Sequence, residues 1–203
     1  MTNYFNDDTK TLLAMNQANW YMFNKHIHNF SEEISSNIRY NILVLVDNIM
    51  KNLDIKYWLT NGTALGFIRD NDFIPWDDDI DIDVYSEDLM PKFKSLVNYL
   101  INAGFVCRVV ERGNVSKISA YMNNFKISIG AVYLEEDFRK SISCSYPKRF
   151  YENSIEFTYR DRKFNVPAPT DDYLSYLYKD WKTPTRSDNV REYNQEYLYR
   201  WVN

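Results

Sequence analysis

Residues 77–83 read Asp77-Asp78-Asp79-Ile80-Asp81-Ile82-Asp83, and this stretch decides the fold and the chemistry that we expect. Acidic and apolar residues alternate from position 79 to position 84, which is the pattern of a strand that buries one face. The isoleucines then lie on the buried face, and the carboxylates of Asp77, Asp79, Asp81 and Asp83 share the other. We call these four residues the acid row. Asp78 falls out of the alternation, and we expect its side chain to point to the opposite face.

A row of aspartates on a strand needs a physical reason, because Asp is among the poorest strand formers. Two like charges 4 Å apart repel by about 4 kcal/mol at an effective dielectric near 20. A hard divalent cation removes this repulsion, since Mg²⁺ and Mn²⁺ prefer carboxylate oxygens as ligands. The acid row therefore predicts a Mg²⁺ or Mn²⁺ site.

The acid row has two other possible explanations. A solvated edge strand carries charges that discourage aggregation, but it does not explain the apolar face formed by Ile80, Ile82 and Val84. A calcium-binding loop would place acidic ligands at Asp77, Asp79 and Asp81, but Ile82 then stands where the loop requires a glycine. Both readings fit less well than a catalytic metal site.

The segments on either side of the acid row predict an α+β domain. Apolar residues at steps of three and four predict a helix from about Ser31 to Leu53. Residues 57–60 predict a strand, Asn61-Gly62-Thr63 a tight turn, and residues 64–69 the first turns of a helix. The other expected elements are a helix over 87–103, strands over 105–110, 115–122 and 125–133, strands near 155–157 and 163–166, and a helix over 171–178 capped by Thr170. This order predicts a mixed sheet flanked by helices.

Composition limits the classes of function. The 203 residues suit a single domain over 1–203, with an N-terminal helical extension at 1–30 and a polar tail at 186–203. A net charge of −4 argues against a nucleic-acid-binding protein. No signal peptide and no membrane-spanning run is visible, and the two cysteines, Cys107 and Cys144, favour a reducing compartment. We therefore expect a soluble, cytoplasmic protein; the sequence leaves its oligomeric state open.

Two stretches resemble a known family. The segment from Tyr57 to Arg69, with Asn61-Gly62-Thr63 in its middle, and the segment from Phe73 to Ile82 closely resemble the signature of the LicD/fukutin family. Residues 166–169, 173–174 and 177–184 are similar to the C-terminal element of that family, with Lys179 where a glycine is common. The resemblance covers about residues 35–185.

The resemblance implies a nucleotidyltransferase-like fold and a metal-dependent reaction. Family members transfer a phospho-alcohol, such as phosphocholine or ribitol phosphate, from a CDP-linked donor to a glycan hydroxyl and release CMP. We expect Asp79 and Asp81 to be catalytic and to hold the metal together with Asp77. Asp83 is either a further ligand or an exposed strand end. Gly62 and Thr63 are expected to cradle the donor phosphate, because a turn before a helix can present N–H groups to an anion.

Three further features of the sequence stay open. Arg69 pairs with the phosphate, with the acid row or in a structural salt bridge. Trp76 is expected to pack with Pro75 rather than to stack on a base. Strand 126–133 lacks the acidic residue that family members often carry on this strand. Either an acidic residue at 135–137 takes its role, or two or three carboxylates of the acid row are enough for activity. The alternatives are a nucleotidyltransferase acting on a protein, nucleic acid or small molecule, and a non-catalytic binding module.

Overall fold

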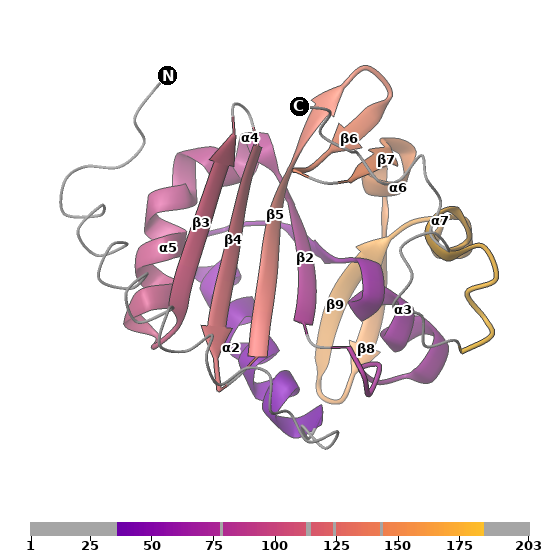
Figure 1. Cartoon of the computed structure of the whole chain (residues 1–203), viewed down its shortest axis with the longest axis horizontal. Coiled ribbons are helices and arrows are strands. Elements are labelled where there is room, and N and C mark those ends of the chain that lie inside the picture. Colours follow the sequence, from indigo (N-terminus) through magenta and orange to yellow (C-terminus); the bar gives the residue numbers. More distant parts are fainter. Residues whose placement is uncertain (1–35, 78, 113–114, 124, 143, 185–203) are drawn as a thin grey trace.

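The computed structural model describes residues 36–77, 79–112, 115–123, 125–142 and 144–184. At its centre is a mixed sheet with the strand order β1-β2-β5-β4-β3, and β6 and β7 extend it from the far end of β5 (Figure 1). The strands of the sheet are β1 (Tyr57–Leu59), β2 (Asp79–Tyr85), β3 (Val106–Arg112), β4 (Val115–Met122), β5 (Phe125–Glu135), β6 (Phe138–Lys140) and β7 (Ser145–Pro147).

Strand β2, which carries most of the acid row, lies inside the sheet between β1 and β5. It pairs antiparallel with β1 and parallel with β5. In the parallel pair Asp79 lies opposite Lys126, Asp81 opposite Ser128 and Asp83 opposite Gly130. A separate hairpin of β8 (Ser154–Tyr159) and β9 (Arg162–Pro167) lies beside β1 (Figure 1).

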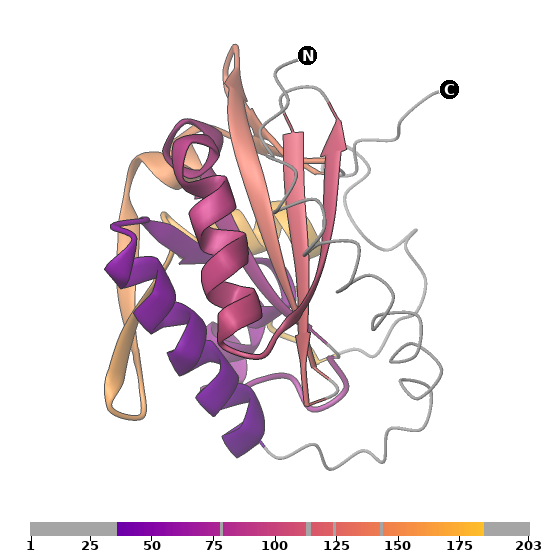
Figure 2. The same ribbon diagram turned by 90° about the vertical axis from the view of Figure 1, so that its left-hand side faces the viewer.

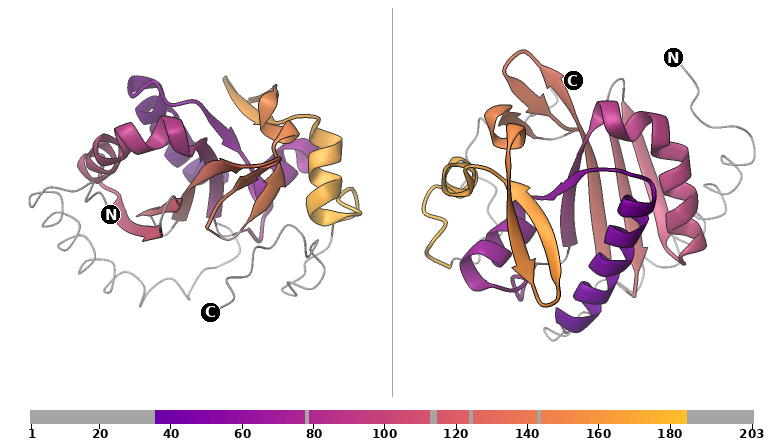
Figure 3. Two further views of the ribbon diagram at one scale, coloured as in Figure 1. Left: turned by 90° about the horizontal axis from the view of Figure 1, so that it is seen from above. Right: turned by 180° about the vertical axis from the view of Figure 1, so that it is seen from behind.

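Two helices cover one face of the sheet. Helices α2 (Ser36–Asn52) and α5 (Phe93–Asn102) lie side by side on that face, as Figure 2 and the rear view of Figure 3 show. Helix α3 (Asn61–Asp70) lies between β1 and the loop that leads into β2, and it contacts both β2 and α7. The remaining helices are α4 (Ser86–Leu89), the 3-10 turn η1 (Met90–Lys92), α6 (Arg149–Glu152) and α7 (Thr170–Tyr178).

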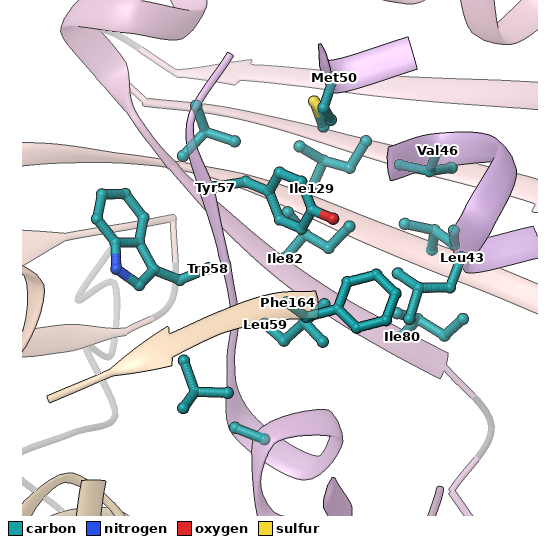
Figure 4. Close-up of a cluster of buried hydrophobic side chains, with 14 of the residues drawn as sticks. Leu43, Val46, Met50, Tyr57, Trp58, Leu59, Ile80, Ile82, Ile129 and Phe164 are labelled. Atoms are coloured by element: carbon teal, nitrogen blue, oxygen red, sulfur yellow. The ribbon is translucent and has the colours of Figure 1, made fainter. Parts of the chain in front are cut away.

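The hydrophobic core forms between the sheet and α2 (Figure 4). Ile80 and Ile82 of β2 point toward Leu43 and Val46 of α2, and all four side chains are buried. Phe164 of β9 closes the same cluster. Because side chains alternate along a strand, the aspartates of β2 lie on the face that points away from α2.

Most of the expected elements are confirmed, and the α+β class with a mixed, helix-flanked sheet is among them. Three local predictions are wrong. Helix α3 begins at Asn61, so Asn61-Gly62-Thr63 is its first turn rather than a turn before it. The helix expected over 87–103 is broken into α4, η1 and α5 around Pro91, which has no N–H to continue the ladder. Thr170 is not the cap of α7 but its first residue, and its hydroxyl donates a hydrogen bond to the carbonyl of Pro167.

Some predictions lie outside the described residues. These are the N-terminal extension 1–30, the helix start near Ser31, the tail 186–203 and the side chain of Asp78. Within the part of the chain that the structure describes, no helix is both long enough and apolar enough to cross a membrane.

Candidate active site

Asp81 stands at the centre of the acid row, and its backbone is fixed from both sides by α3 and the residue that precedes it. Thr60 donates its backbone N–H to the carbonyl of Asp81 at 3.1 Å. The N–H of Asp81 in turn donates to the hydroxyl of Thr63 at 2.9 Å. Thr63 is buried, so this contact is shielded from water. The first turn of α3 is thus joined to the middle of β2.

Gly62 leaves room for the carboxylate of Asp77. A Cβ atom added at Gly62 would overlap Oδ2 of Asp77 and would lie 3.2 Å from its Cγ. The carboxylate of Asp77 therefore lies directly against the first turn of α3. Negative charge at this position is favoured by the partial positive charge of a helix N-terminus. Of the expected phosphate-site residues, the structure brings Gly62 and Thr63 into contact with the acid row.

Asn61 begins α3 in a left-handed backbone conformation, with a φ of 49°. Asn tolerates this region better than most residues. Tyr146 donates its hydroxyl to Oδ1 of Asn61, and the N–H of Asn61 donates to the hydroxyl of Tyr173, both at 3.1 Å. Both tyrosines are buried. The turn that precedes Gly62 is therefore held by side chains from β7 and α7, which sequence reasoning did not identify.

Arg39 of α2 holds the loop that enters β2. It is only 3% exposed, and its Nη1 donates to the carbonyls of Ile74 at 2.9 Å and Asp77 at 3.3 Å. Its guanidinium also lies 4.9 Å from the ring centroid of Phe73. Burial lowers the pKa of Arg39, and the charges of Asp77 and Asp72 oppose that change. The available sequence signal was the position of Arg39 one and two helical turns before Leu43 and Val46, which are buried on the same face of α2.

Asp83 is not an exposed strand end, so that expectation is wrong, and its alternative role as a further metal ligand stays a prediction. It is 5% exposed, and Tyr151 of α6 donates its hydroxyl to Oδ2 at 2.6 Å. Its carboxylate lies over Gly130, where an added Cβ would come within 2.8 Å of Oδ1. Burial raises the pKa of Asp83 to about 6, although the hydrogen bond from Tyr151 lowers it. Asp83 is a packed structural carboxylate.

Asp79 and Asp81 are partly exposed and remain on the open side of β2. Burial, followed by the negative charges of Asp79 and Asp77, raises the pKa of Asp81 well above its usual value. Such mutual repulsion shows that the three carboxylates are electrostatically close. In the described residues, however, no three acidic, His or Cys side chains converge as a finished metal-binding group.

One reason for this lack of convergence is that Asp79 is already engaged by β5. The ammonium group of Lys126 lies 2.7 Å from Oδ2 of Asp79. Ser128 donates its hydroxyl to the same oxygen at 3.2 Å. On β5, positions 126, 128 and 130 face the acid row, and none of them is acidic. Strand β5 therefore presents a lysine, and no carboxylate, to Asp79.

Two other expected site residues take positions that the sequence left open or missed. Arg69 donates two hydrogen bonds to the neighbouring Asp70, at 2.8 and 2.7 Å, which is the salt-bridge alternative. Trp76 is 43% exposed, so the expected packing role is wrong. Its indole stands at the surface, one residue before Asp77. Trp181, in contrast, is buried, and it packs the segment after α7 against the core.

The family model described as "LicD/FKTN/FKRP, nucleotidyltransferase domain" matches residues 54–170, which is more than half of the chain. The chain belongs to the LicD/FKTN/FKRP family. The matched region contains the first turn of α3, the acid row and strand β5, so the contacts described above lie within the family domain.

Curated relatives in this family differ in length from the chain. The ribitol-5-phosphate transferase FKTN of Mus musculus is 27% identical over 158 residues, which cover 72% of this chain and 33% of that protein. An uncharacterised protein of Rickettsia typhi is 36% identical over 155 residues, covering 70% of this chain and 46% of that protein. The human ribitol 5-phosphate transferase FKRP is 41% identical over 44 residues, covering 22% of this chain and 9% of that protein. The matched part of the chain therefore spans between 9% and 46% of the length of these relatives.

A solved structure shares the fold. A solution structure of the antibiotic-resistance factor ANT(2'')-Ia superposes with a TM-score of 0.51 at 13% sequence identity, covering 78% of this chain and 80% of that chain. The likeness is one of fold. Together with the description of the family domain, it confirms the predicted nucleotidyltransferase-like fold of this LicD-family chain.

Proposed function

We propose that this LicD-family chain is an enzyme that transfers a phospho-alcohol, of the ribitol-phosphate or phosphocholine type, from a CDP-linked donor to a hydroxyl group of a glycan. The observation that carries the proposal is the union of the acid row with the first turn of α3. Thr63 holds the backbone of Asp81, and Gly62 makes room for the carboxylate of Asp77. Two of the relatives, FKTN and FKRP, are ribitol-phosphate transferases, which supports the type of group transferred.

The oxygen ligands that the acid row offers fit a hard divalent cation. Asp77, Asp79 and Asp81 supply carboxylate oxygens, which Mg²⁺ and Mn²⁺ prefer. Their mutual repulsion, expressed in the raised pKa of Asp81, is the electrostatic cost that a cation would relieve. These three residues would hold the ion, and Asp83 would not, because it is buried against Tyr151 and Gly130. Such an ion, when bound, supplies Lewis-acid stabilisation of the charge on the reacting phosphate oxygens.

The first turn of α3 is the place proposed for the donor phosphates. A helix N-terminus directs backbone N–H groups and partial positive charge toward an anion. Gly62 lies in that turn beside the acid row, and the left-handed Asn61 fixes its entry. The guanidinium of Arg69 is paired with Asp70, so it must leave that carboxylate before it can contact a donor phosphate. Gly62 and Thr63 are therefore the main phosphate-positioning residues that we propose, with Arg69 as a further one.

The proposed transfer exchanges one P–O bond for another. The oxygen of the acceptor hydroxyl attacks the phosphorus atom that bears the alcohol, while the bond from that phosphorus to the bridging oxygen breaks. CMP leaves with the bridging oxygen, and the hydroxyl proton passes to a carboxylate of the acid row. Asp79 and Asp81, on the open side of β2, are the residues placed to orient the acceptor and take that proton.

Incubation with a panel of CDP-alcohols and Mg²⁺ or Mn²⁺ tests this proposal, with the nucleotide products separated chromatographically. We expect CMP from the wild-type chain, none after chelation, and none from Asp79→Ala. The matched control is Asp171→Ala, which removes an exposed aspartate of α7 and should leave CMP release unchanged. Equal CMP release by wild type and Asp79→Ala would reject the role of the acid row.

The same assay separates the competing functions. A nucleotidyltransferase would release pyrophosphate from a nucleoside triphosphate and leave CDP-alcohols intact. A binding module that only retains the fold would turn over neither donor. The description of the family domain favours keeping nucleotidyl transfer as the second candidate.

A further inference from the structure

Lys126 occupies an unusual place for a lysine, because it lies on the same face of the sheet as the acid row. Strand β5 places it directly opposite Asp79 in the parallel ladder. Its Nζ lies 2.7 Å from Oδ2 of Asp79, and both side chains are largely covered. The hydroxyl of Ser128 donates to the same carboxylate oxygen. The pair is therefore built into adjacent interior strands rather than formed by chance at the surface.

The neighbouring residues strengthen the positive character of this side of the row. Lys117 of β4 lies opposite Gly130 of β5, on the same face as Lys126. A carboxylate on β5 would instead add to the repulsion within the row. The described part of β5 thus offers positive charge where a further anionic ligand would be needed to hold a second cation.

Charge balance gives the same result. Asp77, Asp79 and Asp81 carry three negative charges when all are ionised, and Asp83 is engaged separately by Tyr151. One divalent ion and the ammonium groups of Lys126 and Lys117 already balance these three charges with one positive charge to spare. A second divalent ion would add two further positive charges to a face that offers only these three carboxylates, and like charges at short distance repel.

We propose that Lys126 is a built-in cation that takes the place of a second divalent ion, so that the loaded site of this LicD-family chain holds one ion. This inference rests on the proposed function, because it assumes that the acid row binds a divalent cation. Lys126 is a positioning residue in this account. It fixes the carboxylate of Asp79 and competes for its charge with the incoming ion.

Titration of the full chain with Mn²⁺, followed by electron paramagnetic resonance of the free ion, tests the inference directly. We expect one bound Mn²⁺ per chain. Lys126→Met should bind Mn²⁺ about fivefold more tightly, which is the upper range for an ion pair with partial exposure. Lys126→Glu, which sets a carboxylate beside Asp79, should bind a second Mn²⁺. Circular dichroism of each variant establishes that it is folded.

Lys163→Met is the matched control. Lys163 also forms an ion pair, with Glu156 at 2.6 Å, but its side chain is 65% exposed on the β8–β9 hairpin. Its removal should not change Mn²⁺ binding. Two ions in the wild type, or equal Mn²⁺ affinity in Lys126→Met and Lys163→Met, would overturn the role of Lys126 while leaving CMP release and the proposed function standing. No bound ion in any variant would overturn both.

Discussion

The hydroxyl of Thr63 accepts a hydrogen bond from the backbone N–H of Asp81 at 2.9 Å, across 18 residues of sequence. This contact joins the two motifs of the LicD-family signature, the Gly-Thr pair and the acid row, into one unit. It also explains why a buried threonine is needed at the start of α3. A side chain without an acceptor would leave the N–H of Asp81 unpaired at the centre of the site.

Thr63→Val should therefore destabilise the protein, because valine has the shape of threonine but no hydrogen-bond acceptor. Loss of the partner of a buried N–H costs about 1–3 kcal/mol. We expect that decrease in the free energy of unfolding, measured by urea denaturation, together with loss of CMP release. Thr63→Ser should retain most of both, and Thr183→Val, at an exposed threonine, should change neither. Unchanged stability in Thr63→Val would mean that the contact with Asp81 is dispensable.

Gly62→Ala tests whether Asp77 depends on the space beside α3. The added methyl group would overlap Oδ2 of Asp77 and must displace that carboxylate. We expect Mn²⁺ affinity to fall about tenfold or more, as is typical when the support of a metal ligand is removed. The chain should still fold, because the displaced atom belongs to a side chain at partial exposure.

A double-mutant cycle identifies the route of this effect. In the Asp77→Ala background, Gly62→Ala should cause little further loss of Mn²⁺ affinity, since no carboxylate remains to be displaced. Additive losses in the double variant would show that Gly62 acts on the ion by another path.

Arg39→Met tests how the loop before β2 is held. Methionine keeps an apolar side chain but loses the hydrogen bonds to the carbonyls of Ile74 and Asp77. Hydrogen bonds to a charged group contribute about 1.5–3 kcal/mol to stability. We therefore expect the free energy of unfolding, measured by heat or urea denaturation, to decrease by about that amount. Arg149→Met removes an exposed arginine whose nearest carboxylate, on Asp172, is 3.9 Å away, and should cost about 0.5 kcal/mol or less. Equal losses in the two variants would contradict the holding role of Arg39.

Asp83 predicts a specific dependence of stability on pH. Its folded pKa of about 6 lies above the ordinary value of 3.8, so between these values the folded chain binds more protons than the unfolded chain. The contribution of Asp83 to the free energy of unfolding is therefore fully present at low pH and decreases as the pH rises from about 4 to 6. A shift of about two units corresponds to roughly 3 kcal/mol.

Asp83→Asn removes this titration and keeps an oxygen that can accept the hydrogen bond from Tyr151. In the absence of divalent ions, the stability of wild type relative to Asp83→Asn should decrease by about 2–3 kcal/mol from pH 4 to pH 7.5. Urea unfolding of both proteins across that range provides the measurement. A difference that stays constant with pH would show that Asp83 does not titrate in the folded state.

Much of the fold could be predicted from local patterns in the sequence. The alternation around Ile80 and Ile82 predicted a strand with one buried face, and the core confirms it. The steps of three and four in α2 predicted a helix, and the helix is confirmed, but its buried face is shifted from the predicted stripe. Ile42 and Ile49 are buried as expected, whereas Ile38 is exposed and Leu43, Val46 and Met50 are buried instead. Period and turn chemistry act over a few residues, so the sequence displays them directly. The mixed sheet follows from the order of such elements.

The contacts that shape the site were less accessible to sequence reasoning, because they join distant positions. Arg39 reaches the carbonyl of Asp77 across 38 residues, and Tyr151 reaches Asp83 across 68. Nothing in the local alternation distinguishes Asp83 from Asp81. The difference arises from α6, which covers one end of the row and leaves the other open. The exposure of Trp76 likewise depends on tertiary packing.

We propose that Asp77, Asp79 and Asp81 jointly hold a divalent ion. Crystals of the chain soaked in Mn²⁺, with data collected at the manganese absorption edge, would reveal that ion and its ligands. We expect an anomalous peak bound by carboxylate oxygens of these three residues, with Lys126 still near Asp79 and Asp83 still bonded to Tyr151. A fully soaked crystal with no peak at the acid row, and with those carboxylates directed into solvent, would contradict it.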